Sequence, residues 1–115
     1  MNYQWNIFWA DLNPVKGSEQ KGIRPVLVVS EEAVNQALPI VTILAITSWK
    51  EGRNIYPVEY LLSPEDSSLP IISIVMAHQI RSIPKDRLLE KCGIISNEDC
   101  RDKIRNIVKL YLDLV

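Results

Sequence analysis

Short apolar runs along most of the chain predict β-strands. The first covers residues 7–12. The second, from about 24 to 29, contains the valine-rich run 26–29 between a proline and a serine, which is typical of a buried strand. Residues 40–47 are almost wholly apolar and therefore predict a central strand. Three further strands are predicted at residues 56–62, 71–76 and 79–83.

Helical patterns are shorter and concentrate near the C-terminus. Ser30 is predicted to cap a short helix over residues 31–38, and residues 85–91 are predicted to form one or two helical turns. Residues 96–99 (SNED) form a capping box ahead of a last helix. The apolar residues of this helix recur at spacings of three and four, which gives one face to pack on the sheet: Cys100, Ile104, Ile107, Val108, Tyr111 and Leu112.

These elements predict a fold that is mainly β with a C-terminal helix. We expect a small antiparallel barrel or twisted sheet, closed by the helix, in a single domain over residues 1–115. Trp5 and Trp9 alternate with Ile7 and are predicted to pack in the core or in a dimer contact. Apolar residues beyond the helical stripe indicate burial against a second subunit: Leu110, Leu114 and Val115.

Charge and cysteine content narrow the function classes. The formal net charge of −1 provides no overall positive field, so binding of nucleic acid must use a local basic patch. Cys92 and Cys100 fit neither a metal finger nor a disulfide framework, and reduced cysteines suit the cytoplasm. The chain starts without the pattern of a secretory signal, and its longest apolar stretches are too short to span a membrane. We therefore expect a cytoplasmic protein with no membrane contact.

The polar loop between the first two predicted strands carries the candidate chemistry. Lys16, Glu19, Lys21 and Arg24 fall within a single short segment there. Two glycines in the same segment allow a ligand to approach the backbone closely. A loop of mixed charge that ends in an arginine at the start of a strand is suited to hold a phosphate.

Segment 16–25 (KGSEQKGIRP) resembles the PemK/MazF family, whose members are toxins of bacterial toxin–antitoxin pairs. Residues 46–48 (ITS) and 79–88 (QIRSIPKDRL) match next, and the final helix is in its place, so the resemblance covers nearly the whole chain. It implies an SH3-like, PemK/CcdB-like barrel with helices that forms a homodimer. It also implies sequence-specific cleavage of single-stranded RNA such as mRNA, without a metal or cofactor. A cognate antitoxin is expected to occupy the RNA groove.

The resemblance assigns roles to three residues. It implies that Arg24 is the catalytic arginine, that Thr47 is its catalytic partner, and that Glu19 belongs to the active site. When the 2′-hydroxyl of the RNA attacks, Arg24 is suited to bind phosphate oxygens but not to act as a base, because arginine stays protonated. Thr47 can donate one hydrogen bond to the same phosphate. Glu19 either positions Arg24 or accepts the 2′-proton, and the sequence leaves both roles open.

RNA binding also needs backbone charge and stacking surfaces. Trp49, just after Thr47, is the best aromatic candidate, and Gln79 and Arg81 lie on a strand that the family uses near its groove. The predicted RNA contacts are Lys16, Ser18, Gln20, Lys21, Ser48, Trp49, Arg53, Gln79 and Arg81.

The chain departs from the family pattern at two places. Trp5 and Asn6 stand where the family commonly has Gly-Asp, and His78 stands where it often has an acid. The resemblance implies that these positions line the RNA groove. One alternative is therefore a decayed toxin that binds RNA or its antitoxin without cleaving. The other is a toxin of the same fold that binds gyrase through its C-terminal residues.

Overall fold

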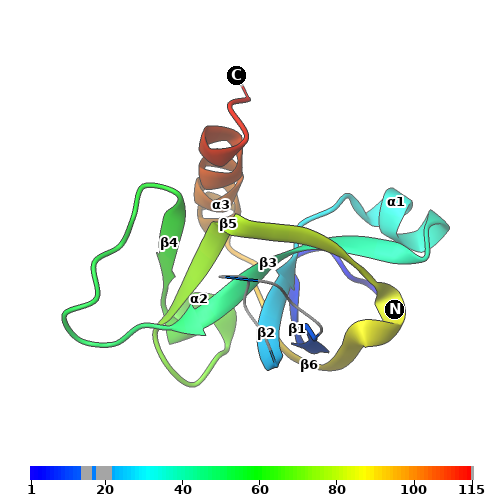
Figure 1. Ribbon diagram of the computed structural model, residues 1–115, viewed down its shortest axis with the longest axis horizontal. Helices are drawn as coiled ribbons and strands as arrows, with labels where there is room; N and C mark the ends of the chain where they lie inside the picture. Colours follow the sequence, from blue (N-terminus) through cyan, green and yellow to red (C-terminus); the bar gives the residue numbers. More distant parts are fainter. Residues whose placement is uncertain (14–16, 18–21, 115) are drawn as a thin grey trace.

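One antiparallel sheet of six strands forms the body of the protein (Figure 1). The computed structural model describes residues 1–13, 17 and 22–114. Across the sheet the strand order is β4-β5-β3-β2-β1-β6, and each neighbouring pair is antiparallel. The predicted mainly-β class with a C-terminal helix is confirmed. In chain order the strands are β1 (Asn6–Asp11), β2 (Ile23–Val28), β3 (Ile40–Ser48), β4 (Glu59–Leu62), β5 (Ser73–Pro84) and β6 (Leu88–Ile94).

The sheet curls until the segment after β4 meets β6, but it does not close into a hydrogen-bonded barrel within the described residues. The segment that makes this contact is the short helix α2 (Pro64–Ser67). At Gly93 of β6 an added Cβ would lie 2.3 Å from the carbonyl oxygen of Ser67. The predicted barrel is thus an open, curved sheet whose seam depends on a glycine.

Three further helical segments flank the sheet: α1 (Glu32–Ala37), the 3₁₀ turn η1 (Lys85–Arg87) and α3 (Glu98–Tyr111). In Figure 1, α3 stands on the sheet and points away from it. Cys100 and Ile104, near its start, are buried in the core. Ile107 and Val108 are partly buried and pack against the same core cluster. Tyr111 and Leu112, at the end of the predicted apolar stripe, are exposed. No helix among the described residues is both long and apolar enough to cross a membrane.

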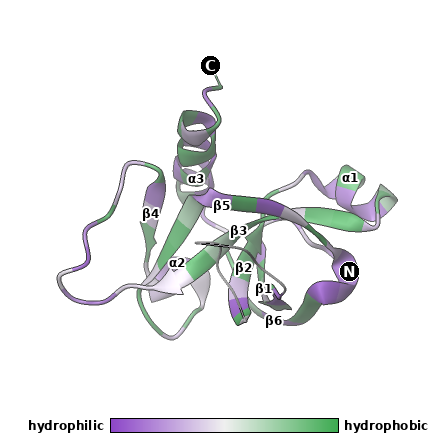
Figure 2. Ribbon diagram, in the orientation of Figure 1, coloured by the Kyte–Doolittle hydropathy of each residue, from purple (hydrophilic) through white to green (hydrophobic). Residues whose placement is uncertain are grey.

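Apolar side chains cover both faces of the curved sheet. Ile7 stands opposite Leu27 on the face beneath α3 and belongs to one core cluster. Phe8 stands opposite Val26 on the other face and belongs to a second cluster. Figure 2 shows the resulting hydrophobic stretches in β2, β3 and β5. Burial on both faces explains why these strands appear in the sequence as nearly continuous apolar runs.

The two strands predicted between residues 71 and 83 are a single strand, β5. Its pairing with β3 continues across a bulge, where the register moves from Ala45 opposite Met76 to Ile43 opposite Arg81. The sequence prediction was wrong here because a bulge interrupts the local alternation while the hydrogen-bonded ladder resumes beyond it.

Long-range pairing also corrects the segment that follows β5. Only η1 is helical in the predicted helical stretch 85–91, because Leu88 and the residues after it pair with β1 as β6. The strand predicted at residues 56–62 begins at Glu59, and the loop predicted after it contains α2. The local charge pattern of residues 85–91 favoured a helix, and pairing with β1 overrides it.

Both predicted helix caps shift by one residue. Glu31, not Ser30, caps α1, and the Ser30 hydroxyl accepts a hydrogen bond from the Thr42 N–H of β3 instead. Asn97, not Ser96, caps α3. Asparagine caps helices as well as serine does. The direction in which the backbone enters a helix therefore decides which side chain reaches the free N–H groups of the first turn.

The two N-terminal tryptophans have different surroundings. Trp5 is 5% exposed and belongs to the core beneath α3, with the guanidinium groups of Arg101 and Arg105 over its ring. Trp9 is 42% exposed, beside Pro25 on the neighbouring strand. The core position predicted for Trp5 is confirmed. Trp9 lies outside the core of this chain, and its dimer contact stays a prediction.

Candidate functional site

Arg24 and Thr47 come from separate strands and meet on one face of the sheet. β2 and β3 pair with Val26 opposite Ala45. Continuing this register by two residues places Arg24 opposite Thr47, and opposed residues have Cβ atoms roughly 4.5–5.5 Å apart. Both residues are half-buried. The fold therefore brings together the predicted arginine and threonine, which are far apart in the chain.

A cavity of about 270 Å³ opens beside this pair. Arg24, Thr47 and Ser48, all predicted contacts, contribute to its wall. The rest of the wall is mostly apolar: Trp9, Ile23, Pro25, Ile46, Leu69, Pro70, Ile71 and Ser73. A pocket with a few polar groups in an apolar wall is typical of a small-ligand or nucleotide site.

The β1–β2 loop carries most of the other predicted contacts, and these lie outside the described residues: Lys16, Ser18, Glu19, Gln20 and Lys21. The ends of the loop are tied together. The Leu12 N–H donates to the Gly22 carbonyl at 2.9 Å, and the Gly22 N–H donates to Asn13 Oδ1 at 3.2 Å. Gly22 has a φ of +78°, which favours glycine. The loop thus returns to the sheet directly before Arg24.

Two arginines, one in the second half of β5 and one in η1, hold the base of this loop. Arg81 Nη1 donates to the Leu12 carbonyl at 3.3 Å, and Arg87 Nη1 donates to the Asn13 carbonyl. Arg81 stands opposite Ile43, which lies on the same face of β3 as Thr47. Arg81 therefore brings positive charge to the site's face while anchoring the loop. Its predicted contact with RNA stays a prediction.

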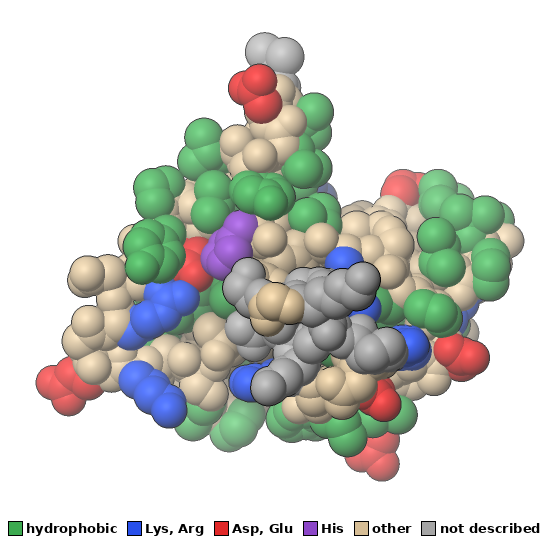
Figure 3. Space-filling model, in the orientation of Figure 1, with side chains coloured by type: hydrophobic (Ala, Val, Ile, Leu, Met, Phe, Trp, Pro, Cys, Tyr) green, Lys and Arg blue, Asp and Glu red, His purple; other side chains and the backbone are tan. Residues whose placement is uncertain are grey.

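Gln79 and His78 lie in the bulge of β5, and both are half-buried. The Nδ1 atom of His78 is buried and has no hydrogen-bond partner among the described residues. In Figure 3 the histidine lies at the surface, beside acidic and basic side chains. His78 lies close enough to Glu59 for its charge to act on that carboxyl.

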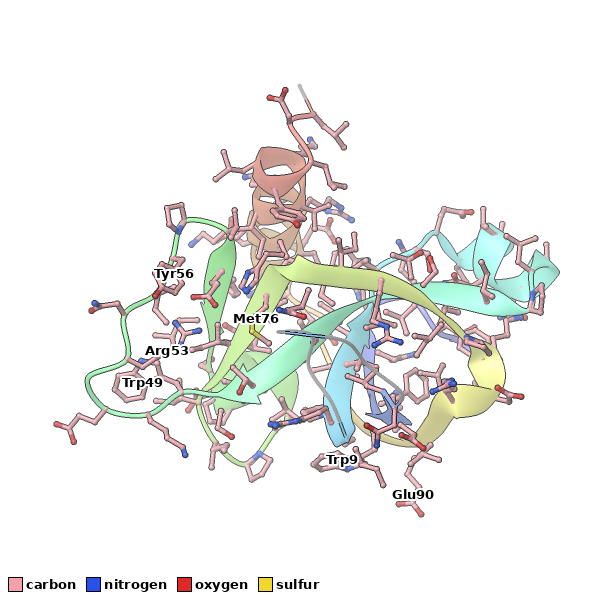
Figure 4. The ribbon with its side chains drawn as sticks, viewed as in Figure 1. Trp9, Trp49, Arg53, Tyr56, Met76 and Glu90 are labelled. Atoms are coloured by element: carbon pink, nitrogen blue, oxygen red, sulfur yellow. The ribbon has the colours of Figure 1, made fainter. Side chains whose placement is uncertain are left out.

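Residues 49–58 connect β3 to β4 and fold beside the sheet (Figure 4). The Trp49 N–H donates to the Ile72 carbonyl at 3.0 Å, and its indole N–H donates to the Arg53 carbonyl at 3.1 Å. The half-buried Trp49 packs against a small cluster on the same face as Thr47: Ala45, Ile74 and Met76. Trp49 therefore supports the loop, and its predicted stacking on RNA is untested.

Arg53 is held by a buried carboxylate. Its Nη1 and Nη2 atoms donate to the two oxygens of Glu59 at 2.9 and 2.7 Å, and the Tyr56 N–H donates to Glu59 Oε1 at 3.0 Å. The Glu59 side chain is 0% exposed. Burial raises the pKa of Glu59, but the hydrogen bonds from Arg53 and Tyr56 and the charges of Arg53 and His78 lower it below its ordinary value. Arg53 is thus engaged within the chain as well as a predicted RNA contact.

Positive charge collects on this face although the chain is slightly acidic overall. Figure 3 shows Lys and Arg side chains on several sides of the centre of the view, with most acidic side chains toward its margins. This arrangement agrees with the local basic patch that a chain of net charge −1 needs if it binds nucleic acid.

Sequence reasoning missed the roles of Glu59 and Tyr56. The available signal was a glutamate at a strand start beside apolar residues, followed by an alternating strand. A carboxylate there needs a cation when it is buried, and Arg53 lies six residues earlier. The pairing depends on how the loop folds back, which the sequence pattern does not show.

Comparison with known proteins decides the family. The family described as the PemK-like, MazF-like toxin of type II toxin–antitoxin systems matches residues 3–112. The chain belongs to this toxin family. The endoribonuclease MazF of Staphylococcus saprophyticus is 33% identical over 109 residues, which cover 95% of this chain and 89% of that protein. The endoribonuclease EndoA of Bacillus subtilis is 32% identical over 110 residues, which cover 96% of this chain and 93% of that protein.

Solved structures agree with this assignment. MazF from Deinococcus radiodurans has a TM-score of 0.79 and 26% identity, covering 97% of this chain and 96% of that one. A mycobacterial endoribonuclease in complex with its cognate antitoxin has a TM-score of 0.81 at 23% identity, covering 100% and 98% of the two chains, and so shares the fold. The predicted family and fold are confirmed, and the curated relatives confirm the predicted class, an endoribonuclease toxin.

Proposed function

We propose that this PemK/MazF-family toxin is a sequence-specific endoribonuclease that cleaves single-stranded RNA at a phosphate bound by Arg24 and Thr47. The observation that carries the proposal is that Arg24 and Thr47 line the same cavity. The β2–β3 register, continued by two residues beyond Val26 and Ala45, places them opposite each other. The names of the curated relatives, MazF and EndoA endoribonucleases, support the same reaction class.

The proposed chemistry uses the 2′-hydroxyl of the RNA as the nucleophile. Its oxygen forms a bond to phosphorus, the bond to the 5′-oxygen breaks, and the products carry a 2′,3′-cyclic phosphate and a 5′-hydroxyl. The planar guanidinium of Arg24 suits two phosphate oxygens and the charge that develops on them. Thr47 donates one hydrogen bond to the same group. Loss of such a charge-stabilising donor typically costs about 2.7–4 kcal/mol in the barrier.

The proton of the 2′-hydroxyl needs an acceptor. Glu19 is the proposed candidate, either as that acceptor or as the group that orients Arg24. The tied ends of the β1–β2 loop support this assignment, because they fix where the loop leaves and rejoins the sheet beside Arg24. The other proposed RNA contacts remain Lys16, Ser18, Gln20, Lys21, Ser48, Trp49, Arg53, Gln79 and Arg81.

We also infer a homodimer and a cognate antitoxin. The last turn of α3 leaves large apolar side chains exposed, as expected of a surface that a second copy covers: Leu110, Tyr111, Leu112 and Leu114. An antitoxin partner is supported by the mycobacterial relative and by a Deinococcus radiodurans MazF at 25% identity, each solved with its antitoxin. The two free cysteines, whose thiol pKa values burial raises, agree with the proposed cytoplasmic location.

Cleavage of a mixed-sequence RNA by the purified protein tests this proposal. We expect cleavage in the presence of EDTA, at a defined short sequence, with 5′-hydroxyl ends that a kinase can label directly. Arg24→Ala should abolish most of it. The matched control is Lys103→Ala, which removes one exposed positive charge from α3. An inactive wild-type protein, or activity that needs added metal, would contradict the proposal.

The two alternatives give different results in the same set of experiments. A decayed toxin binds the RNA tightly without cutting it. A gyrase-binding toxin inhibits supercoiling and leaves RNA intact. The exposed end of α3 is the surface that such a gyrase partner would use, but the curated relatives are both named endoribonucleases.

A further inference from the structure

Tyr56 presents an aromatic ring on the loop that follows Thr47. It is 60% exposed, far more than an aromatic residue with a packing role. Figure 4 shows it on the β3–β4 loop, near Arg53 and on the same side of the sheet as Trp49. The Arg53 guanidinium lies over the ring, 5.4 Å from its centroid. One ring face is therefore covered by a cation, and the exposed area belongs to the other face and the edges.

The ring is held in place from beneath. Glu59 binds Arg53 with both carboxylate oxygens and also accepts the Tyr56 N–H, and the Glu59 N–H donates to the Tyr56 carbonyl at 2.9 Å. A buried carboxylate therefore fixes both the backbone of Tyr56 and the cation on its ring. A preorganised exposed ring loses little conformational freedom when a flat ligand covers it.

The residue that anchors this ring lies two strands from the proposed cleavage centre. Glu59, which holds Tyr56, stands opposite Met76 of β5, and Met76 stands opposite Ala45, two residues before Thr47 on β3. Trp49 joins the loop to the cluster of Ala45 and Ile74, and Ile74 stands opposite Thr47. An RNA strand that runs from a phosphate at Thr47 across β5 reaches the edge of the sheet on which Tyr56 stands. Single-stranded nucleic acids bind where a basic groove is lined by aromatic rings that stack on unpaired bases.

Trp49 is less suited to this role. Its indole N–H is used by the Arg53 carbonyl, and its ring packs against the sheet. From these observations, and resting on the proposed function, we propose that Tyr56 is the base-stacking platform of this toxin: an unpaired RNA base next to the cleaved phosphate stacks on the ring face opposite Arg53.

An RNA containing the mapped cleavage sequence tests this inference. A 2′-deoxy nucleotide at the attacking position prevents cleavage, and 2-aminopurine replaces each neighbouring base in turn. Wild-type protein should quench the fluorescence at one position, because stacking quenches 2-aminopurine. Tyr56→Ala should remove that quenching and weaken binding about 5- to 150-fold, whereas Tyr56→Phe should keep both. Ile55→Ala is the matched control on the same loop.

The results separate this inference from the proposed function. Equal quenching and affinity in Tyr56→Ala, with cleavage still lost in Arg24→Ala, would overturn the stacking role alone. If the wild type does not cleave, an arbitrary RNA 12-mer with 2-aminopurine at each position in turn takes the place of the mapped sequence. Quenching that depends on Tyr56 then supports the platform while the nuclease proposal fails, and no dependence on Tyr56 overturns both. Thermal unfolding of each variant shows that the loop change has not unfolded the protein.

Discussion

At the scale of single residues, the charges of this protein have two different uses. Arg24 lies beside Thr47 at a cavity, where a guanidinium can meet a phosphate. Arg53 instead meets a carboxylate that is removed from solvent, and this pair orders a loop. A buried ion pair adds little net stability by itself, but removing one partner leaves the other uncompensated. Residue type alone therefore does not distinguish a ligand-binding arginine from a structural one.

The pair at the cavity is expected to respond unequally to substitution. Arg24→Ala should slow RNA cleavage about 100- to 1000-fold, as for removal of one oxyanion-hole donor. Thr47→Ala removes a single hydrogen bond to the charged phosphate and should cost about 10- to 150-fold. Thr47→Ser keeps the hydroxyl and should stay close to wild type. Single-turnover cleavage rates measure all three, and an inactive Thr47→Ser with an active Thr47→Ala would rule out the hydrogen-bond role.

The buried pair predicts an order of stabilities. Arg53→Ala leaves the Glu59 carboxylate buried without its cation, so it should lower the free energy of unfolding more than Glu59→Gln does. Glu59→Gln keeps an acceptor and leaves Arg53, which is partly exposed, in contact with water. Urea unfolding at pH 7 makes the comparison. The opposite order would show that leaving the Glu59 carboxylate unpaired destabilises the protein less than leaving Arg53 unpaired.

The pH dependence of stability follows from the lowered pKa of Glu59. A carboxyl whose pKa is lower in the folded state stabilises the protein above its unfolded value, near 4.5, and loses this contribution as the pH falls through the folded value. The stability difference between wild type and Glu59→Gln should therefore shrink as the pH falls below about 4.5. A difference that does not change with pH down to the acid transition would contradict the assignment.

At the scale of elements, the seam between α2 and β6 and the bulge in β5 shape the sheet. The bulge lets one strand carry His78 and Gln79 between two regular stretches. The seam lets the curved sheet approach closure without a further ladder. Both features are long-range, since each joins residues that are distant in the chain.

Gly93→Ala tests the seam. The added Cβ meets a backbone oxygen, which cannot rotate away, so one of the two elements must shift. We expect a loss of about 1–3 kcal/mol in the free energy of unfolding, as for other overpacked sites. Leu89→Ala, at an exposed position of the same strand, is the control and should change little. Equal free energies of unfolding for the two variants would mean that α2 or β6 shifts to accommodate the added methyl group at little cost.

At the scale of the whole molecule, the fold leaves two kinds of surface. One face carries the positive charge (Figure 3), and the loop with Tyr56 lies at its margin (Figure 4). The projecting end of α3 carries exposed apolar side chains instead. The first surface suits RNA and an acidic antitoxin segment, and the second suits a second copy of the chain.

Substitution at the end of α3 tests the dimer. Leu110→Asp combined with Leu114→Asp should shift the protein from dimer to monomer at micromolar concentration, because a charge in an apolar interface loses its hydration. Light scattering after gel filtration measures the mass. Lys109→Asp on the same turn is the control and should leave the dimer intact. A wild-type monomer, or a dimeric double variant, would place the interface elsewhere or remove it.

Much of the fold could be predicted from local patterns. Burial on both sides of the sheet gives β2 and β3 nearly continuous apolar runs, and periodic apolar residues mark the start of α3. Local patterns failed where pairing at long range decides the structure. The segment after η1 became β6, β5 stayed one strand across its bulge, and α1 and α3 each took the neighbouring residue as cap.

The sequence by itself determined the family, because a segment of defined residue order, KGSEQKGIRP, needs no knowledge of distant contacts. It also suggested Arg24 and Thr47 as the catalytic pair, which stays a proposal. Tertiary structure alone decided that Glu59 is buried against Arg53, that Trp5 is in the core while Trp9 is not, and that Tyr56 keeps an exposed ring. The physical reason is that burial and charge pairing depend on which distant segments meet. Register, bulges and loop paths set those meetings, and residue order within one segment does not record them.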